Sequence, residues 1–325
     1  MRRQRLPTAG RRLVAAIAAL AVVAVVVVAA VELVPRRPPA PVGAFGLPLD
    51  LDPQSPSLVD TRGLPDRERA ALSRITSRPQ AVWLTERTGV EQLVRQRVEG
   101  AASLDSVATL VLYRIPRRDC GSYSAPKDDL DAAGYRAWIR AVVAGLGPHR
   151  AVVVVEPDAL ASLDCLRGRA RATRIALLRG AVDRLAAQGS WVYVDAGHSG
   201  WRSPATMARR LRQVDATRAS GFSLNVSAYG STAGEAAYGR AIGKALGRPV
   251  GFVIDTGRNG ASVPRGRWCN ARGARLGRPP TSSPGIRGVD ALLWIKTPGT
   301  SDGTCRGGPA AGVFWPAAAD RLLRR

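Results

Sequence analysis

Short apolar runs rich in β-branched residues recur along the chain, spaced widely enough to leave room for helices between them. Seven of these runs predict β-strands: Ala81–Leu84, Thr109–Ile115, Ala151–Glu156, Trp191–Asp195, Gly221–Asn225, Val250–Asp255 and Ala291–Lys296. Several intervening segments have the apolar spacing of amphipathic helices: Ala132–Leu146, Arg167–Gln188, Pro204–Asp215 and Ala233–Leu246. Strands that alternate with helices predict an α/β fold with a parallel sheet, closed into a barrel or left open.

The run from Val152 to Asp158, VVVVEPD, is the most informative of these strands. Continuous valine is typical of a strand buried on both faces, as in a parallel sheet covered by helices. Because proline cannot donate to a sheet, we expect pairing to stop at Pro157 and Asp158 to lie at the carboxyl end of the strand. Burial there would raise the pKa of its carboxyl group. Alternatively, Asp158 caps a helix over Ala159–Leu163.

Six of the predicted strands end on, or shortly before, a polar residue. These residues are Asp119, Asp158, Asp195, Asn225, Asp255 and Lys296. One such residue is adequately explained as a helix cap. Because the carboxyl ends of parallel strands meet at one edge of a sheet, six of them predict a functional site at that edge.

Length and charge narrow the class of protein. The 325 residues contain no internal repeat and no long linker, so we expect one catalytic domain over residues 44–325, acting as a monomer. The formal net charge of +23 comes almost entirely from arginine. These arginines are scattered rather than gathered in one tract, and no nucleic-acid-binding motif accompanies them. We therefore interpret the charge as surface composition that favours contact with an anionic cell envelope, and expect no nucleic-acid partner.

The N-terminus predicts export. A basic tail over residues 1–12 precedes an uncharged apolar run, Leu13–Val31, which would span about 28 Å as a helix. The positive flank would keep the tail cytoplasmic and place the catalytic domain at the extracellular face of the membrane. Residues 32–43 would form a short proline-rich spacer. Alternatively, cleavage after Ala30 would make the run a signal peptide and the protein secreted.

Four cysteines fit an oxidising compartment, where an even number predicts disulfides with three possible pairings. Pairs Cys120–Cys165 and Cys269–Cys305 would brace loops that follow strands. Zinc is a poor alternative, because the chain has no CxxC motif and its histidines are only His149 and His198. We expect neither a metal nor a cofactor.

Several segments resemble signature blocks of glycoside hydrolase family 6. They are YRIPRRDC (Tyr113–Cys120), VVEPDAL (Val154–Leu160) and VDAGHSGW (Val194–Trp201), followed in the family's order by GFSLNVSAY, VIDTGRNG, RWCN and LLWIKTPGTSDG. The resemblance runs from about Ala44 to the C-terminus. It implies a distorted, partly open parallel α/β barrel of about seven strands, and inverting hydrolysis of a β-1,4-glucan. It also implies the disulfides Cys120–Cys165 and Cys269–Cys305.

The resemblance assigns catalytic roles to four aspartates. Asp158 matches the general acid, which must hold its proton until it protonates the glycosidic oxygen. Asp119 matches a neighbouring aspartate that keeps that proton in place and helps to position water. Asp302 matches the candidate base, acting directly or through a chain of waters. Asp195 matches an aspartate with a supporting role.

The resemblance also assigns substrate contacts. Tyr113 would lie against the distorted sugar, and Trp201 and Trp268 would stack on sugar rings. The hydroxyl-binding positions are matched by His198, Asn225, Arg258 and Lys296. The other tryptophans, Trp83, Trp138, Trp191 and Trp294, lie within predicted strands and helices, so we expect them in the core. Arg118 has an alternative role as a structural ion-pair partner of Asp119.

The chain departs from the family pattern at two places. Thr300 stands where the family usually has a glutamate, and no aromatic residue lies between Pro53 and Arg62, where a tryptophan is usual. We expect weaker binding there, or a glucan other than plain cellulose. The short segment from Asp302 to Phe314 predicts an open cleft and internal cleavage. The alternatives are a non-catalytic, envelope-anchored glucan-binding protein and a hydrolase of another cell-surface polysaccharide.

Overall fold

The computed structural model describes residues 43–59, 61–121, 129–216, 218–264 and 266–324. They belong to one compact unit that begins at Pro41. The predicted tail, anchor and most of the spacer lie outside the described residues. Among the residues that are described, no helix is both long and apolar enough to cross a bilayer.

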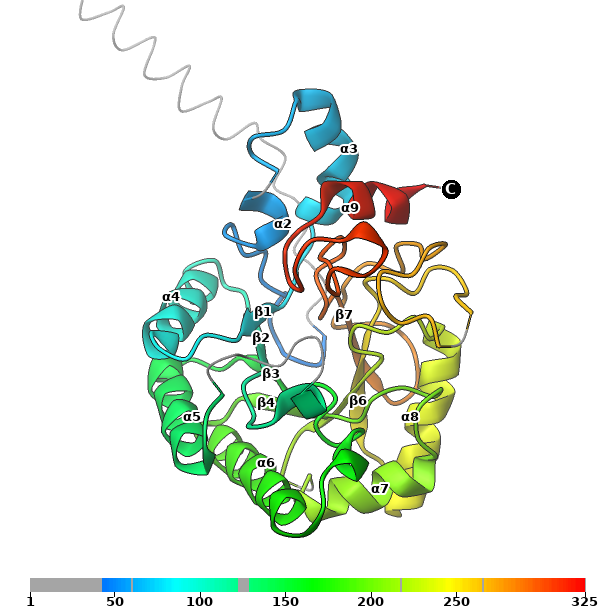
Figure 1. The fold of residues 1–325 in the computed structure, drawn as a ribbon. Helices are drawn as coiled ribbons and strands as arrows, with labels where there is room; N and C mark the ends of the chain where they lie inside the picture. The colour runs from blue at the N-terminus through cyan, green and yellow to red at the C-terminus, as the bar shows by residue number, and fades with distance from the viewer. Residues whose placement is uncertain (1–42, 60, 122–128, 217, 265, 325) are drawn as a thin grey trace, which may run out of the picture. The chain divides into compact units, whose positions relative to one another are not determined.

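Seven parallel strands form one sheet in sequence order, as the alternating pattern predicts (Figure 1). The strands are β1 (Val82–Leu84), β2 (Thr109–Leu112), β3 (Val152–Val155), β4 (Trp191–Asp195), β5 (Gly221–Leu224), β6 (Gly251–Asp255) and β7 (Val289–Leu293). Strands β1 and β7 are the two edges of the sheet, and near them the amide N–H of Ala81 donates to the Trp294 carbonyl at 3.1 Å. The predicted partly open α/β barrel is therefore confirmed.

Several strands end earlier than the apolar runs suggest. The chain turns into the left-handed region at Glu156 (φ 50°), directly after β3, and at Asn225 (φ 65°), directly after β5. That conformation cannot continue a strand. The residues that leave the sheet early are those that build its carboxyl rim.

Helices follow the strands and lie on the outer side of the curved sheet (Figure 1). The α-helices are α2 (Pro56–Val59), α3 (Asp66–Thr76), α4 (Val90–Ala102), α5 (Ala132–Leu146), α6 (Gly168–Gln188), α7 (Pro204–Gln213), α8 (Thr232–Leu246) and α9 (Pro316–Leu323), and the 3-10 helices are η1 (Arg118–Gly121), η2 (Leu163–Cys165) and η3 (Cys305–Gly307). The four predicted helices are present with ends within two residues of prediction. Three of these four helices start with an ordinary cap, where Asp131, Ser203 or Ser231 accepts a backbone N–H from the first turn, whereas α6 follows Arg167 without a side-chain cap.

The strands are buried on both faces, which is why they read as continuous apolar runs. In β3, Val153 and Val155 pack toward the helices, whereas Val152 and Val154 pack inside the curved sheet. Phe45 fills the amino-terminal end of this interior, 5.4 Å from the Trp191 ring. The amino end of the barrel is thus closed by side chains, and polar groups collect at the carboxyl end.

Candidate active site

The turn after β3 holds the first group of site residues. Glu156 and Asp158 both have positive φ, 50° and 70°, which costs a non-glycine residue about 1–3 kcal/mol unless its surroundings hold it there. Helix α6 begins only at Gly168, and residues between Pro157 and Ser162 form turns. Asp158 is therefore not a helix cap, and that alternative is wrong.

Glu156 points away from the site and fastens a neighbouring strand. Its buried carboxylate accepts the amide N–H groups of Arg114 and Ile115, both at 3.0 Å, and the hydroxyl of Tyr135 at 2.9 Å. These donors belong to the segment after β2 and to α5. In the turn Glu156–Asp158, the carboxylate of Glu156 thus holds the backbone that leads to Asp119.

Two buried arginines on the surrounding helices clamp the same loops. Arg174 of α6 donates to the carbonyls of Pro116, at 2.8 Å, and Arg117, at 2.9 Å. Arg210 of α7 donates to the Leu160 carbonyl at 2.7 Å. Part of the arginine content is therefore structural, and the interpretation of the charge as mainly surface composition stays a prediction.

Asp158 lies among other carboxylates with its backbone held in place. Its N–H donates to Asp195 Oδ2 at 2.9 Å, and Asp195 also accepts from Gly197 N at 3.0 Å and Ser223 Oγ at 3.1 Å. Burial, and then the charges of Asp195 and Asp119, raise the pKa of Asp158 well above its ordinary value. Burial raises the pKa of Asp195 to about 6, although these N–H and O–H donors oppose the shift.

Asp119 faces the same space from η1. It has φ 53°, its Oδ2 accepts the Tyr113 hydroxyl at 2.7 Å, and its buried Oδ1 has no partner among the described residues. Arg118 lies 3.9 Å from Asp119 Oδ2 and also covers the Tyr113 ring, 4.0 Å from its centre. The geometry leaves one carboxylate oxygen of Asp119 available to a water or a sugar hydroxyl.

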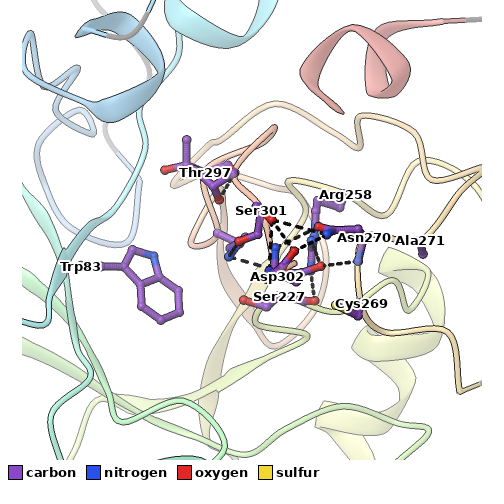
Figure 2. Close-up of polar contacts among 12 residues, drawn as sticks. Trp83, Ser227, Arg258, Cys269, Asn270, Ala271, Thr297, Ser301 and Asp302 are labelled. Carbon is purple, nitrogen blue, oxygen red and sulfur yellow. Dashed lines mark hydrogen bonds and ion pairs between the residues drawn. The ribbon is translucent and has the colours of Figure 1, made fainter. Parts of the chain in front are cut away.

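Asp302 lies in a different environment, surrounded by cations and amides (Figure 2). Arg258 Nη1 lies 2.7 Å from Oδ2, and Lys296 Nζ lies 3.5 Å from Oδ1. Oδ2 also accepts the Asn270 N–H at 2.9 Å, while Asn270 Oδ1 accepts the N–H of Asp302 at 2.9 Å. Burial alone would raise the pKa of Asp302, but Arg258 and Lys296 outweigh it and hold that pKa below its ordinary value.

Both predicted disulfides are present, one in each group of residues. Cys120 and Cys165 join η1 to η2, and Cys269 and Cys305 join the segment before Asn270 to η3. Each bond lies close in sequence to an aspartate of the site, Asp119 or Asp302. The described residues contain no cluster of acidic, histidine or cysteine side chains able to hold a metal ion.

Two polar residues at strand ends hold backbone instead of facing the open site. Asp255 accepts the N–H groups of Ser227 at 3.0 Å and Lys296 at 3.0 Å, so it ties the ends of β5 and β7 to β6. Asn225 is fully buried, and its amide donates to the carbonyls of Asp255 at 2.8 Å and Gly230 at 3.2 Å. The expected contact of Asn225 with a sugar hydroxyl stays a prediction.

Trp201 and Trp268 lie on the surface, as sugar platforms must. Their side chains are 36% and 53% exposed, which is unusual for tryptophan. The ring of His198 lies 5.7 Å from that of Trp201, its Nδ1 accepts the Gly200 N–H at 3.2 Å, and burial lowers its pKa. The lowered pKa favours the neutral form of His198, which lies beside the exposed indole of Trp201.

Trp83 and Trp191, both expected in the core, are half-buried and pack against the apolar interior of the curved sheet. Trp138 and Trp294 are buried as expected, and Trp191 is half-buried beside Phe45 at the amino end. Trp83 is half-buried, stands perpendicular to Tyr113 with ring centres 4.9 Å apart, and has Lys296 Nζ 6.0 Å from its ring. Figure 2 places its indole across from Asp302. A lone tryptophan in a strand carried no sequence signal for this position.

Asn270 is another site residue that sequence reasoning missed. Besides its two bonds with Asp302, its amide donates to the carbonyls of Gly303 at 2.8 Å and Cys305 at 2.9 Å. Its position next to Cys269 was the available signal. Thr300 stands where the family usually has a glutamate. It is buried, and its hydroxyl donates to the Thr297 carbonyl at 2.9 Å.

Comparison with known proteins gives a consistent result. The model of glycosyl hydrolases family 6 matches residues 57–325. Endoglucanase A of Cellulomonas fimi is 40% identical over 260 residues, which cover 79% of this chain and 56% of that protein. Endoglucanase 1 of Streptomyces sp. (strain KSM-9) is 40% identical over 266 residues, covering 79% of this chain and 73% of the relative. The chain thus spans little more than half of the Cellulomonas relative.

A solved structure agrees in fold and in sequence. The endoglucanase Cel6 from Mycobacterium tuberculosis, solved in complex with methyl-cellobiosyl-4-deoxy-4-thio-β-D-cellobioside, is 42% identical and superposes with a TM-score of 0.80. The match covers 86% of this chain and 97% of that one. With the family model covering most of its length, this chain belongs to glycosyl hydrolases family 6.

Proposed function

We propose that the protein hydrolyses internal β-1,4-glucosidic bonds of a cellulose-like β-glucan, with inversion at the anomeric carbon and Asp158 as the general acid. One observation carries the proposal: Asp158 and Asp302, both on the carboxyl rim, have pKa values shifted in opposite directions. Two carboxyl groups whose surroundings separate their pKa values in this way are suited to acid and base roles.

Asp158 supplies the proton that the leaving sugar needs. It donates that proton to the glycosidic oxygen as the bond to the anomeric carbon breaks. Because burial and the neighbouring charges of Asp195 and Asp119 oppose a further negative charge, ionisation of Asp158 is unfavourable until the proton has a better acceptor. Asp195 also holds the backbone of Asp158 through the 2.9 Å bond to its N–H, so we assign it a positioning role.

A water molecule attacks the opposite face of the anomeric carbon and loses a proton. Asp119 Oδ1, buried without a partner among the described residues, is suited to orient that water. Asp302 is ionised but is a weak base, because two cations stabilise its charge. We therefore propose that the proton reaches Asp302 through intervening water, and that the product is the α-anomer.

The aromatic residues provide surfaces for successive sugar rings. Trp201 and Trp268 present exposed indoles, and Trp83 presents a third beside Tyr113. Trp83 also lessens the importance of the missing aromatic between residues 53 and 62. The polar groups proposed to bind hydroxyls are His198, Arg258 and Lys296, whereas the burial of Asn225 supports a role in holding backbone. The names of the endoglucanase relatives and the ligand of the Mycobacterium structure support a glucan substrate.

The short segment after Asp302 supports internal cleavage. After Asp302 the chain returns within a dozen residues to Phe314, where Ser301 N–H donates to the Val313 carbonyl at 2.8 Å and Thr300 pairs with Phe314. The Cys269–Cys305 disulfide fastens this short segment. The segment is too short to form a loop that covers the site. We further propose action outside the cell, anchored or secreted, as a monomer; two disulfides support an oxidising compartment.

The test is hydrolysis of a panel of β-glucans by the parent protein and by Asp158→Asn. We expect cleavage of carboxymethyl-cellulose or mixed-linkage glucan, with viscosity falling faster than reducing ends appear, and an α-anomeric product by NMR. The asparagine variant should lose about 10³-fold in kcat while retaining cello-oligosaccharide binding. Binding without hydrolysis by the parent protein would instead identify a non-catalytic glucan-binding protein.

A further inference from the structure

The loop over residues 196–202, here called the platform loop, carries both His198 and Trp201. It follows β4 directly, and its first part is held by Asp195, which accepts the Gly197 N–H at 3.0 Å. A second backbone contact, from Asn225 N–H to the Gly197 carbonyl at 2.8 Å, fixes the same end. Neither contact explains what holds the loop near Trp201.

Glu235, in the first turn of α8, holds that part of the loop. Its side chain is fully buried, and it accepts the Ser199 hydroxyl at 2.7 Å and the Ser199 N–H at 3.1 Å. One turn later, the Tyr238 hydroxyl donates to the Arg202 carbonyl at 2.7 Å. An acidic residue in a first turn usually faces solvent and the helix dipole. Glu235 faces the platform loop instead.

The loop after β5 closes over the Glu235 carboxylate from the other side. A Cβ placed on Gly230 would lie 2.1 Å from Glu235 Oε1, so a larger residue there would force the carboxylate to move. The carboxylate is thus enclosed between Ser199 and Gly230, away from the four aspartates to which catalytic roles were assigned. No step of the proposed hydrolysis uses it.

We propose that Glu235 is a positioning residue for the sugar platform: by gripping Ser199 it sets the orientation of Trp201 and His198, and so controls glucan binding rather than bond cleavage. The inference rests on the proposed sugar contact of Trp201. The platform loop then has two carboxylate anchors with separate duties. Asp195 serves the acid, through the backbone of Asp158, and Glu235 serves the platform.

The grip of Glu235 depends on its charge, which gives the platform a pH dependence. Burial raises the pKa of Glu235 to about 7, against the opposing effect of the Ser199 bonds. Below that pH the carboxyl group is protonated and accepts the two Ser199 donors less well. Two titratable groups face this region: Tyr238, whose pKa the Glu235 charge helps to raise, and His198, which is next to Ser199 in the chain. Tyr238 in turn is affected by the charges of Asp195, Arg202 and Arg210.

The experiment is Glu235→Gln in the full-length protein, which keeps the shape of the side chain and removes the charge. We expect KM for a soluble β-glucan to rise about 5- to 10-fold, with kcat changed less than about twofold. In the parent, KM should rise as the pH falls through about 7, and the variant should lack that rise. A His198 contribution to the profile would persist in both proteins, so the difference between them isolates Glu235.

Hydrogen exchange provides a readout that does not require activity. Exchange of amides in residues 196–202 should be faster in Glu235→Gln than in the parent. The matched control is Asp290→Asn. Asp290 lies in β7, accepts the Tyr193 hydroxyl at 3.0 Å and, like Glu235, has a pKa raised by burial, so the substitution removes a similar carboxylate elsewhere in the fold. The control should leave KM and the exchange of residues 196–202 unchanged even if it lowers the melting temperature.

A double-mutant cycle tests the contact itself. Ser199→Ala should raise KM by about threefold, and adding Glu235→Gln should raise it less than the product of the two single effects. Unchanged KM and unchanged exchange in a folded Glu235→Gln protein would overturn the inference. If no glucan is hydrolysed by the parent, the proposed function fails, and exchange together with cello-oligosaccharide titration by Trp fluorescence still decides the role of Glu235.

Discussion

The two halves of the carboxyl rim treat the same residue type in opposite ways. In the half built on β2 to β4, Asp158 lies among Asp119 and Asp195, and its pKa is raised. In the half built on β5 to β7, Asp302 contacts Arg258 and Lys296, and its pKa is lowered. Both aspartates are affected by burial first, so burial does not distinguish them.

What distinguishes the halves is the sign of the nearest charges. Arg258 and Lys296 lie within 4 Å of Asp302. The charges that act on Asp158 are instead those of Asp195 and Asp119, and Arg118 pairs with Asp119 rather than with Asp158. A buried carboxylate with cationic partners stays ionised, and one among carboxylates keeps its proton. In the proposed mechanism, the cations on one side of the rim therefore decide which aspartate is the acid and which is the base.

Removing Arg258, the cation nearest to Asp302, should reduce the difference in pKa between Asp158 and Asp302. In Arg258→Gln, Lys296 is the one cation of the described pair that Asp302 keeps, so the pKa of Asp302 rises and the acid limb of the kcat/KM profile moves to higher pH. We expect kcat/KM to fall about 100-fold at neutral pH. Stopped assays from pH 4 to pH 9 provide the measurement, with Arg258→Lys as the charge-retaining control. An unshifted acid limb would mean that Asp302 takes no part in proton transfer.

Stability should also depend on pH differently in the two halves. Because the folded pKa of Asp195 is raised to about 6, its contribution is complete below its ordinary value and is lost as the pH rises through about 6. That loss amounts to roughly 3 kcal/mol of unfolding free energy. Asp302, with a lowered pKa, contributes above its ordinary value and loses that contribution as the pH falls further.

Urea unfolding at a series of pH values from 4 to 8 measures this effect. The unfolding free energy should fall between pH 4 and pH 7 in the parent and fall less in Asp195→Asn. The asparagine variant keeps an oxygen that can accept from Asp158 N–H, so its fold should survive. Equal slopes in the two proteins would contradict the raised pKa of Asp195.

The position of Trp83 between the halves predicts a smaller effect. Its indole lies beside Tyr113 of one half and Lys296 of the other. Trp83→Ala should weaken cello-oligosaccharide binding about 10-fold, because a stacking surface is lost. Isothermal titration measures this, with Trp191→Ala at the amino end as the matched control. Equal affinity in Trp83→Ala and the parent would return Trp83 to a structural role.

Thr300 provides the smallest of these changes. The side chain is buried beside the Asp302 half, and its hydroxyl bonds only to the carbonyl of Thr297 among the described residues. Thr300→Glu restores the carboxylate that the family resemblance predicts, and we expect KM to fall about two- to threefold. An unchanged or increased KM on every glucan tested would show that this position does not limit binding.

Much of the fold was predictable because most strand residues are buried on both faces, so the strands appear as largely apolar runs. The same pattern placed polar groups at the carboxyl rim but not their directions. Glu156 and Asp158 are two residues apart, yet the first bonds to the backbone after β2 and the second faces the site. Side-chain direction after a strand depends on local φ and ψ, which hydrophobic periodicity does not report.

Other site residues were not predictable for a different reason. Trp83, Asn270 and Glu235 acquire their roles from partners more than 25 residues away in the chain: Lys296, Asp302 and Ser199. Polar residues in a helix or beside a cysteine have many ordinary explanations. The disulfides were predictable because the family resemblance supplied a pairing that spacing alone left open.

The arginine clamps have a practical consequence for redesign of the protein. Arg174 bridges two carbonyls with one guanidinium, and Arg210 reaches the Leu160 carbonyl and, at 2.6 Å, Asp164. A lysine at either place would keep a positive charge. Its single ammonium group could not replace the two nitrogens that reach different acceptors: Nη1 of Arg174 to Ala159 and Nη2 to Pro116 and Arg117, and Nη1 of Arg210 to Leu160 and Nη2 to Asp164. Substitutions of arginine by lysine should therefore be confined to exposed arginines, because Arg174 and Arg210 also hold the loops that they contact in place.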